Sequence, residues 1–375
     1  MAIQGGPDIV EDGLVLHLDA AEPLCFRGEP TTNVVANSIP DANWFVGNYG
    51  GSTVTRSDLI EDNIPFMRFS NVNVPTGGTY PRINNSSMTS TITGTFSASL
   101  EARGTEGAVV NFNIYSSGST RVSFAVTLTS EWTRYEFTTT TAYNLDTPYF
   151  QPRATGATYD IRNIQIEAKP YSTPFVVGTR GSTVATGGGL LDITNNGNNG
   201  TINRAASPSA AFYSGDNKGS LVFDGVDDYV NCGTPSISAG KITVNAWVKI
   251  TTGGIFQHIV DSSSSSWHLA ILNNNTPYFW NGSVYHLYSP ILTVGQWYML
   301  TGVQGTTLDI YINGVLGQSI ASDVNVTTNT VNLGRFQGYG RQLNSNIAQV
   351  SIYNRALTAS EIQQNYNATK GRFGL

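Results

Sequence analysis

Charged side chains are scarce in this chain. Asp, Glu, Lys and Arg make up only 12% of its 375 residues, which is about half the proportion in a typical soluble protein. The polar surface must therefore come mainly from Ser, Thr, Asn and Gln, and this composition favours strands joined by tight turns. The formal net charge is −6, and the sequence shows no basic stripe that could displace counterions from a phosphate backbone. We therefore expect no nucleic-acid partner.

Cysteines and long apolar runs are also lacking. The two cysteines, Cys25 and Cys232, are too few for a disulfide framework, and we expect two free, buried thiols. No apolar run approaches the roughly 20 residues of a membrane span, so we expect no membrane insertion. The opening MAIQGGPDIVEDG lacks the basic and apolar regions of a secretory signal peptide. We therefore expect cytoplasmic synthesis without a signal.

The sequence also lacks the local motifs of common enzymes. It contains no GxSxG elbow, HExxH helix, phosphate-cradling GxxxxGK[ST] loop or CxxC pair. Some pair among its 26 acidic residues could lie at the separation that glycosidases use, but no local pattern singles one out. We therefore predict a protein that is not an enzyme.

Short strands dominate what is present, especially after Gly219. The pieces GSLVFDGVDDYVNCG, KITVNAWVKI and GQWYMLTGVQGTTLDIYINGVLG are apolar or alternating, and each closes in a Gly, Asn or Asp turn. This rhythm predicts an all-β protein built from β-sandwiches. One helix is predicted at 358–367, TASEIQQNYN, because Thr358 and Glu361 form a capping-box pattern.

The order of these pieces resembles the laminin-G-like, concanavalin-type jelly roll. The ending IYNRALTASEIQQNYNATKGRFGL resembles the tail of structural proteins from tailed bacteriophages, especially those of cyanobacteria and marine bacteria. The resemblance implies a virion component made in the host cytoplasm: a fibre, a capsid-decoration protein or a baseplate appendage. It implies other virion proteins as partners, a homo-oligomer with a trimer as one candidate, and host surface polysaccharide as a candidate ligand.

Two alternatives to this adhesion role remain open. The first is a purely structural decoration protein that clamps the capsid and binds no glycan. The second is a depolymerase that cleaves host polysaccharide.

Two distant segments of the sequence indicate a split domain. GLVLHLDA at 13–20 resembles the opening strand of the jelly roll, but its usual continuation appears only at LLDITNNGNNGTI, residues 190–202. Between them, EWTRYEFTTT and YDIRNIQIEA are similar to the late strands of carbohydrate-binding-module jelly rolls. We therefore predict a laminin-G-like jelly roll at 1–33 and 180–375, interrupted by a second β-sandwich at 34–179.

The phrase FDGVDDYV at 223–230 is a candidate metal site. Asp224, Asp227 and Asp228 could supply the oxygen ligands that Ca²⁺ prefers, and many laminin-G-like domains bind Ca²⁺. Alternatively, the same residues shape a tight turn, because Asp side chains accept hydrogen bonds from the backbone nearby. A late acidic pair found in some relatives is replaced here by Ala348 and Gln349. Apart from this ion, the sequence indicates no cofactor.

Aromatic clusters are the candidate sugar-binding sites, because exposed rings stack on pyranose faces at low entropic cost. Alternation places Tyr278 and Trp280 on one face of a strand and Phe279 on the other. Alternatively, these rings fill the cores or an interface between subunits. The candidate residues are Trp267, His268, Tyr278, Trp280 and Tyr285 in the C-terminal part, and Trp44, Tyr80 and Arg82 in the inserted segment.

Overall fold

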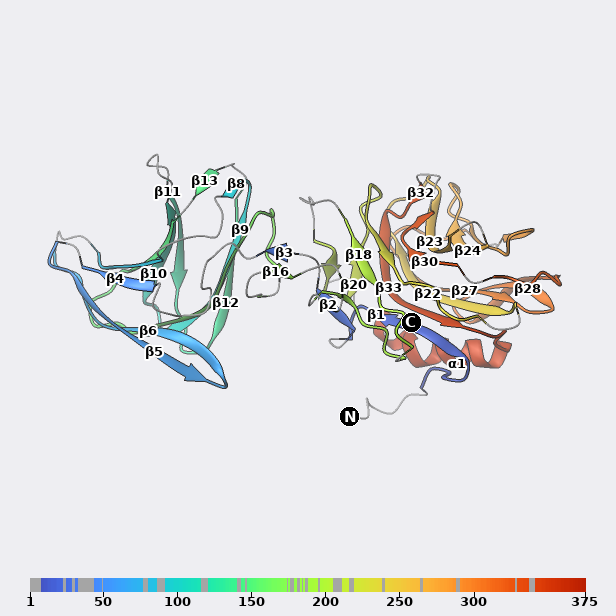
Figure 1. The fold of residues 1–375 in the computed structure, drawn as a ribbon, viewed down its shortest axis with the longest axis horizontal. Coiled ribbons are helices and arrows are strands. Elements are labelled where there is room, and N and C mark those ends of the chain that lie inside the picture. The colour runs from blue at the N-terminus through green and yellow to red at the C-terminus, as the bar shows by residue number, and fades with distance from the viewer. Residues whose placement is uncertain are drawn as a thin grey trace. The chain divides into compact units, whose positions relative to one another are not determined.

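The chain divides into two compact units, which are described separately (Figure 1). Unit 1 comprises Met1–Pro30, Gly181–Ala206 and Ala211–Leu375, and unit 2 comprises Thr31–Arg180 and Ser207–Ala210. The computed structural model describes residues 8–22, 25–28, 31–32, 44–48, 50–76, 80–85, 92–115, 121–139, 143–145, 147–173, 175, 179–180, 183, 185, 188–194, 196–204, 211–215, 219–237, 240–263, 266–287, 291–327, 329–336 and 341–375.

Unit 1 contains an eight-stranded antiparallel sheet. Its order is β19-β20-β33-β22-β27-β28-β29, and β1 pairs with β33 beside this path. The two central strands, Ile242–Ile250 and Ser345–Tyr353, are buried along almost their whole length. The strands are β1 Leu14–Asp19, β19 Tyr213–Ser214, β20 Ser220–Val222, β22 Ile242–Ile250, β27 Trp297–Gln304, β28 Thr307–Ile312, β29 Val315–Ala321 and β33 Ser345–Tyr353.

A seven-stranded sheet provides the other half of the unit 1 sandwich. Its order is β18-β21-β30-β23-β24-β25-β26, and side chains of both sheets meet in one apolar core. The strands are β18 Thr201–Asn203, β21 Tyr229–Asn231, β23 Gln257–Ser262, β24 Trp267–Ile271, β25 Pro277–Trp280, β26 Tyr285–Leu287 and β30 Val331–Leu333.

The opening strand β1 lies in the eight-stranded sheet of unit 1. It runs antiparallel to β33, with Leu16 opposite Ile352. The turn after unit 2 also contacts it: Asp192 accepts a hydrogen bond from the backbone N–H of His17, and Asn198 donates one to the carbonyl of Val15. These contacts join segments that are more than 170 residues apart in the sequence. The two cysteines of unit 1 are free and buried, as expected.

The predicted helix is α1, Ala359–Thr369, and it is followed by the short 3₁₀ helix η2, Lys370–Phe373. Thr358 and Glu361 form the predicted capping box, in which each side chain bonds the backbone N–H of the other residue. The helical segment packs on the eight-stranded sheet through Trp247, whose ring stacks on Phe373 at 4.0 Å. No helix in the described ranges is both long and apolar enough to cross a membrane.

Unit 2 is a second sandwich, made of two five-stranded antiparallel sheets with orders β11-β10-β14-β7-β4 and β12-β9-β15-β6-β5. Tyr135 and Phe137 face its core, as the alternation in the sequence predicts. The strands are β4 Trp44–Gly47, β7 Arg82–Asn85, β10 Val109–Tyr115, β11 Arg121–Thr127 and β14 Thr147–Pro152 in one sheet, and β5 Thr53–Glu61, β6 Ile64–Asn73, β9 Ser97–Gly104, β12 Thr133–Thr138 and β15 Tyr159–Glu167 in the other.

Small two-stranded sheets complete the fold. In one of them, Thr179 lies opposite Thr32, so the first and last strands of unit 2 run side by side. The pairs are β2 Phe26–Gly28 with β17 Gly189–Leu190, β3 Thr31–Thr32 with β16 Thr179–Arg180, β8 Ile92–Gly94 with β13 Tyr143–Leu145, and β31 Arg335–Phe336 with β32 Arg341–Gln342.

Candidate functional site

A polar row crosses the outer face of the seven-stranded sheet of unit 1. Asn332 lies opposite Asp261, Asp261 opposite His268, and His268 opposite Trp280. Directly opposed residues of an antiparallel sheet share one face. Phe279, next to Trp280, is fully buried in the core, so this row points away from the core. The prediction that Trp280 and Phe279 take opposite faces is therefore confirmed.

A β-bulge brings His258 to the same face. Residues three apart on a regular strand point to opposite sides, yet His258 and Asp261 both accompany the outer row. The register shifts between His258 and Val260, and Ile259 and Val260 are both part of the core cluster. The extra residue of the bulge reverses the alternation, so His258 and Asp261 face the same way.

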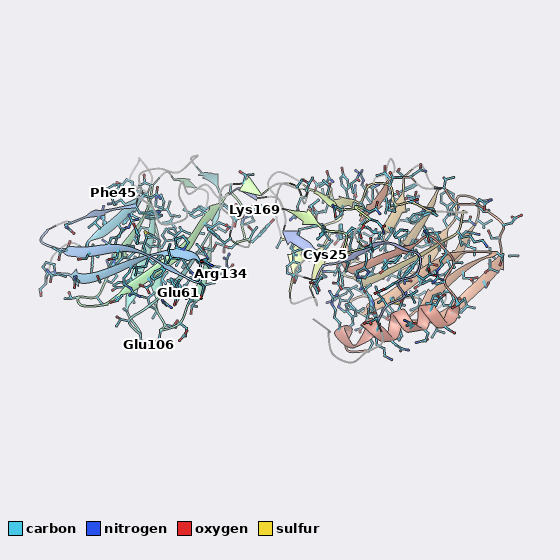
Figure 2. The ribbon with its side chains drawn as sticks, turned by 60° about the horizontal axis from the view of Figure 1, so that its bottom comes forward. Cys25, Phe45, Glu61, Glu106, Arg134 and Lys169 are labelled. Carbon is cyan, nitrogen blue, oxygen red and sulfur yellow. The ribbon has the colours of Figure 1, made fainter. Side chains whose placement is uncertain are left out.

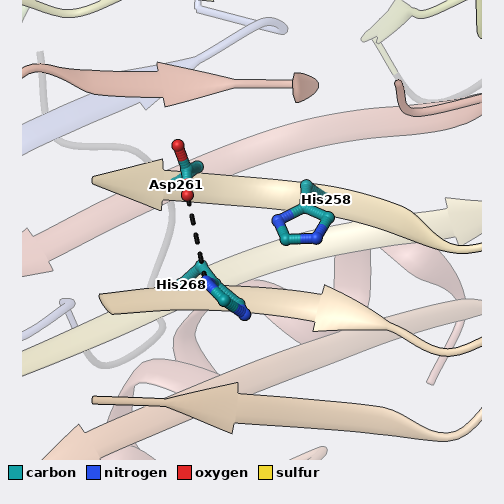
Figure 3. A group of neighbouring side chains, drawn as sticks. All are labelled: His258, Asp261 and His268. Atoms are coloured by element: carbon teal, nitrogen blue, oxygen red, sulfur yellow. Dashed lines mark ion pairs between the residues drawn. The ribbon is translucent and has the colours of Figure 1, made fainter. Parts of the chain in front are cut away.

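His258, Asp261 and His268 form a compact group (Figure 3). One ligand atom from each lies within 4.8 Å of the others. Nδ1 of His268 is 3.9 Å from Oδ1 of Asp261, and the two imidazole rings are 4.6 Å apart. His258 and Asp261 are 0% exposed and His268 is 6% exposed. The sequence analysis included His268 but missed His258 and Asp261.

Burial keeps both imidazoles neutral. Burial, together with electrostatic repulsion from a protonated His268 and from Arg341, lowers the pKa of His258 to about 2. Burial and Arg341 lower the pKa of His268 to about 3. Neutral imidazole is the form that binds metals, because a ring nitrogen then carries a free electron pair. Among the described residues, both ring nitrogens of His258 lack a hydrogen-bond partner. Nδ1 of His268 also lacks one.

The aromatic side chains around this group are too buried to form a surface on which a sugar ring could stack. Trp267 is 0% exposed and belongs to the core, so its ring cannot stack on a sugar, which corrects the expectation from the sequence. Tyr278 is 6% exposed and lies edge-on to His268. Trp280 is half-buried and lies 4.8 Å from His268. The side chain of Tyr285 falls outside the described residues.

The three predicted calcium ligands lie together beside β21. One carboxylate oxygen from each of Asp224, Asp227 and Asp228 lies within 4.8 Å of the others. Asp224 accepts hydrogen bonds from the backbone N–H groups of Val226, at 2.8 Å, and Asp227, at 3.4 Å, as the turn interpretation expects. Asp228 is buried and paired with the Arg204 guanidinium at 3.0 Å. Calcium binding at this group stays a prediction.

In unit 2, the outer face of the sheet containing β10 gathers polar and aromatic side chains. Arg82 extends over the ring of Tyr149 at 5.1 Å, and Arg153 extends over Tyr80 at 3.5 Å. The predicted residues Tyr80 and Arg82 therefore lie on this face. Trp44 does not, because it is 1% exposed and belongs to the core. Its predicted role in sugar stacking is corrected accordingly.

Amide side chains continue this polar face. Asn113 lies opposite Tyr149 on the neighbouring strand, and Tyr149 lies opposite Asn84. Among the described residues, Oδ1 of Asn113 and Nδ2 of Asn84 have no hydrogen-bond partner. The sequence analysis missed these residues, although the alternation VVNFNIY already places the two asparagines of β10 on the face opposite Phe112.

The opposite sheet of unit 2 carries a network of ion pairs. Arg103 and Arg162 both extend over the ring of Trp132, at 4.6 and 4.0 Å, and Nε1 of Trp132 donates a hydrogen bond to Glu61. Arg103 also pairs with Glu61 at 2.7 Å. Figure 2 labels Glu61 and Arg134 on this sheet and Phe45 on the other. Arg103 and Arg162 of this network are paired with the carboxylates of Glu61 and Glu101.

Comparison with known proteins places the fold of the C-terminal part. Residues 224–363 match the concanavalin A-like lectin/glucanases superfamily. The matched segment begins at the Asp224 turn and extends into α1, and it is less than half of the chain. This concanavalin A-like segment has the predicted fold, which is all-β with one short C-terminal helix. No curated protein shows a significant match to the sequence.

Several solved structures are similar in part. The binding domain of botulinum neurotoxin serotype D shares 18% identity over 47% of this chain and 48% of its own, with a TM-score of 0.37. The CBM40 of a Ruminococcus gnavus IT-sialidase, solved bound to α2,3-sialyllactose, shares 13% identity over 33% of this chain and 80% of its own, with a TM-score of 0.29. The chain thus spans about half the length of the toxin domain. Similarities this low support no functional inference.

Proposed function

We propose that this chain is a non-enzymatic structural protein of a tailed-phage virion that adheres to glycans of the host surface. The virion assignment is supported by the ending IYNRALTASEIQQNYNATKGRFGL, which resembles the tails of phage structural proteins. The glycan assignment agrees with the match of residues 224–363 to a superfamily whose name includes lectins. The polar face on the β10 sheet of unit 2 carries the glycan assignment.

This face combines three kinds of groups that recognise sugars: the half-buried ring of Tyr80, the half-buried amide of Asn84, and the guanidinium groups of Arg82 and Arg153. Tyr149 and Asn113 are 3% and 0% exposed and do not contact a ligand themselves. Aromatic rings offer apolar faces, amides both donate and accept hydrogen bonds, and guanidinium groups donate two parallel hydrogen bonds. Arg82 lies over the ring of Tyr149 and Arg153 over that of Tyr80, and these contacts restrict both side chains, which lowers the entropic cost of binding. Two arginines on one face favour sugars that carry a carboxylate.

The same face is suited to binding rather than cleavage. Glycosidases generally need two carboxyl groups on either side of the bond that breaks. The five strands of this sheet, WFVG, RINN, VVNFNIY, RVSFAVT and TPYFQP, contain no Asp or Glu. Adhesion therefore fits this face better than the depolymerase alternative. In a homo-oligomer, several weak sites would act together and bind a repeating polysaccharide with avidity.

A glycan array and purified host surface polysaccharide test the proposal. We expect the wild-type chain to bind, and Arg82→Ala to weaken binding at least about tenfold, which corresponds to the loss of one charge-assisted contact. Arg56→Ala is the matched control, because Arg56 pairs with Asp58 on the opposite sheet, and it should bind like the wild type. If Arg82→Ala binds glycan as tightly as the wild type, the glycan site does not lie on this face.

Two further readouts separate the alternatives. If the wild type binds no glycan on the array and no host polysaccharide, while antibody labelling still finds it on virions, the protein is a structural clamp. If incubation with host polysaccharide generates new reducing ends, it is a depolymerase. Antibody labelling of virions by electron microscopy tests the virion assignment itself, and its absence from particles would overturn that assignment.

A further inference from the structure

The group His258, Asp261 and His268 needs an explanation that sugar binding does not supply. These side chains are in unit 1, on the other sandwich from the proposed glycan face. Their burial has a cost, because polar groups removed from water normally gain a hydrogen-bond partner inside the protein. In the described structure, His258 has none at either nitrogen. A buried imidazole without any partner loses about 1–3 kcal/mol per orphaned group.

The donor set indicates which kind of partner is missing. Two imidazoles and one carboxylate are the protein ligands of many zinc and non-haem iron sites. Ca²⁺ and Mg²⁺ prefer oxygen ligands only, so two imidazoles argue against them. A zinc ion with ligands at about 2.0–2.2 Å would place its ligand atoms about 3.4 Å apart. The present separations of up to 4.8 Å are longer than this value, so binding of the ion requires the side chains to rotate toward it.

The strands hold the three residues with little freedom. Asp261 and His268 lie directly opposite each other on β23 and β24, and the bulge turns His258 toward them. Phe336 stacks on His258 with ring centroids 4.6 Å apart and an interplanar angle of 13°. Asn332 lies opposite Asp261 on the other side, and its Nδ2 has no hydrogen-bond partner among the described residues. Such neighbours orient metal ligands and limit the access of solvent to the ion.

We propose that His258, Asp261 and His268 bind one divalent transition-metal ion of the zinc type. The three side chains supply three ligands and leave a fourth position for water or another ligand. The positive charge of Arg341, which acts on both histidines, weakens the affinity for a dication, and the Asp261 carboxylate offsets it. The ion joins β23 to β24, so the site stabilises the seven-stranded sheet where the bulge interrupts its pairing.

The test uses the full chain without a polyhistidine tag. The protein is freed of metal with a chelator and titrated with Zn²⁺ alone against a chromophoric competitor. We expect one tightly bound zinc ion per chain and a melting temperature that rises with zinc. His258→Gln, Asp261→Asn and His268→Gln should each weaken binding more than about 100-fold, beyond the 10–100-fold typical of residues that only support a ligand. The control is His17→Gln, a buried histidine that bonds Ser351 on the other sheet, and it should bind zinc like the wild type.

A second measurement keeps the proposal falsifiable if a variant does not fold. Co²⁺ added to the wild-type chain should give visible absorption bands of a low-coordinate site with nitrogen ligands, and Zn²⁺ should displace them. No stoichiometric zinc binding by the folded wild type would overturn the proposal, and so would unchanged binding by folded His258→Gln. Loss of binding in His17→Gln would place the ion elsewhere and equally overturn it. None of these results depends on whether the chain binds glycans.

Discussion

The two sheets of unit 1 are in such close contact at Gly302 that we expect even an alanine there to destabilise the fold. This residue lies in β27, in the interior of the eight-stranded sheet, opposite Val244 on one neighbouring strand and Ile310 on the other. A Cβ atom added at Gly302 would lie 2.3 Å from Cγ of Phe279 on the facing sheet. Ordinary contacts of such atoms begin at 3.4 Å. Gly302 therefore leaves the space that the Phe279 ring fills.

The magnitude follows from the lack of room around that ring. Phe279 is 0% exposed, so it cannot retreat by the ångström or so that an alanine requires without displacing other core side chains. Overpacking a dense core costs about 1–3 kcal/mol, and we expect Gly302→Ala to reach the upper end of this range. For a domain of about 150–250 residues, each kcal/mol lowers the melting temperature by about 2–4 °C, so the expected decrease is about 6–12 °C.

Thermal and denaturant unfolding of the full chain measure this effect. Gly215→Ala is the matched control, because the added Cβ has no described atom within 4 Å apart from those of its chain neighbours, and we expect a change within about 0.5 kcal/mol. Adding Phe279→Leu to Gly302→Ala should recover part of the loss, because the smaller side chain frees space at the contact. If Gly302→Ala melts like the wild type, the two sheets do not meet at this point and the reasoning fails.

Three further predictions concern the helix and the buried groups of unit 1. Glu361→Ala removes the carboxylate that accepts the backbone N–H of Thr358 in the capping box and that pairs with Arg355, so we expect the unfolding free energy to fall by about 0.5–2 kcal/mol in chemical denaturation. Arg355 holds the pKa of Glu361 down at about 2, against 4.5 for the ordinary group. The stabilisation by the Glu361 carboxylate is therefore present above pH 4.5 and is lost as the pH falls toward 2. A stability difference between variant and wild type that is the same above pH 4.5 and at pH 2 would contradict this assignment. Burial raises the pKa of Asp228 from 3.8 to about 6, so the stability linked to its proton is complete below pH 3.8 and is lost as the pH rises through 6. Asp228→Asn should therefore gain stability relative to the wild type across that interval in pH-dependent unfolding, and a constant difference would refute the assignment. Trp247→Phe removes the hydrogen bond from Nε1 to Thr369, which is 2.8 Å long, and should lower the unfolding free energy by about 1 kcal/mol; unchanged stability would show that the bond contributes nothing.

The regular features of the fold could be predicted from the sequence because each depends on local chemistry. The capping box needs only Thr358 and Glu361 three residues apart, and the structure has both of its hydrogen bonds. The opposite faces of Phe279 and Trp280 follow from strict alternation along a short regular strand. In such cases the spacing of residue types determines the geometry without any knowledge of the partner strands.

The exposure of the aromatic side chains could not be predicted in the same way. Trp44 and Trp267 were candidates for sugar stacking, but both are buried in the cores. Alternation shows that two residues share a face, but not which face meets the other sheet. That choice depends on pairings between distant strands, such as β23 with β30. The residue pattern of a single sequence does not reveal which distant strands pair. Large rings fill cores more often than surfaces, because their burial contributes most to stability.

The histidine and aspartate group shows a stronger limit, because here the local rule gives the wrong answer. His258 and Asp261 are three apart, so a regular strand would place them on opposite faces and exclude a shared ligand. The bulge between His258 and Val260 reverses this, and no Gly or Asn in QHIVDS marks it in the sequence. The apolar pair Ile259 and Val260 is the one available signal, since both are core residues although they are neighbours on the chain. Two adjacent buried residues in a strand with one polar face require either a bulge or burial on both faces, and polar residues three apart around them favour the bulge. Applied to this chain, that reasoning unites His258 with Asp261, and the zinc titration of the histidine variants tests the result directly.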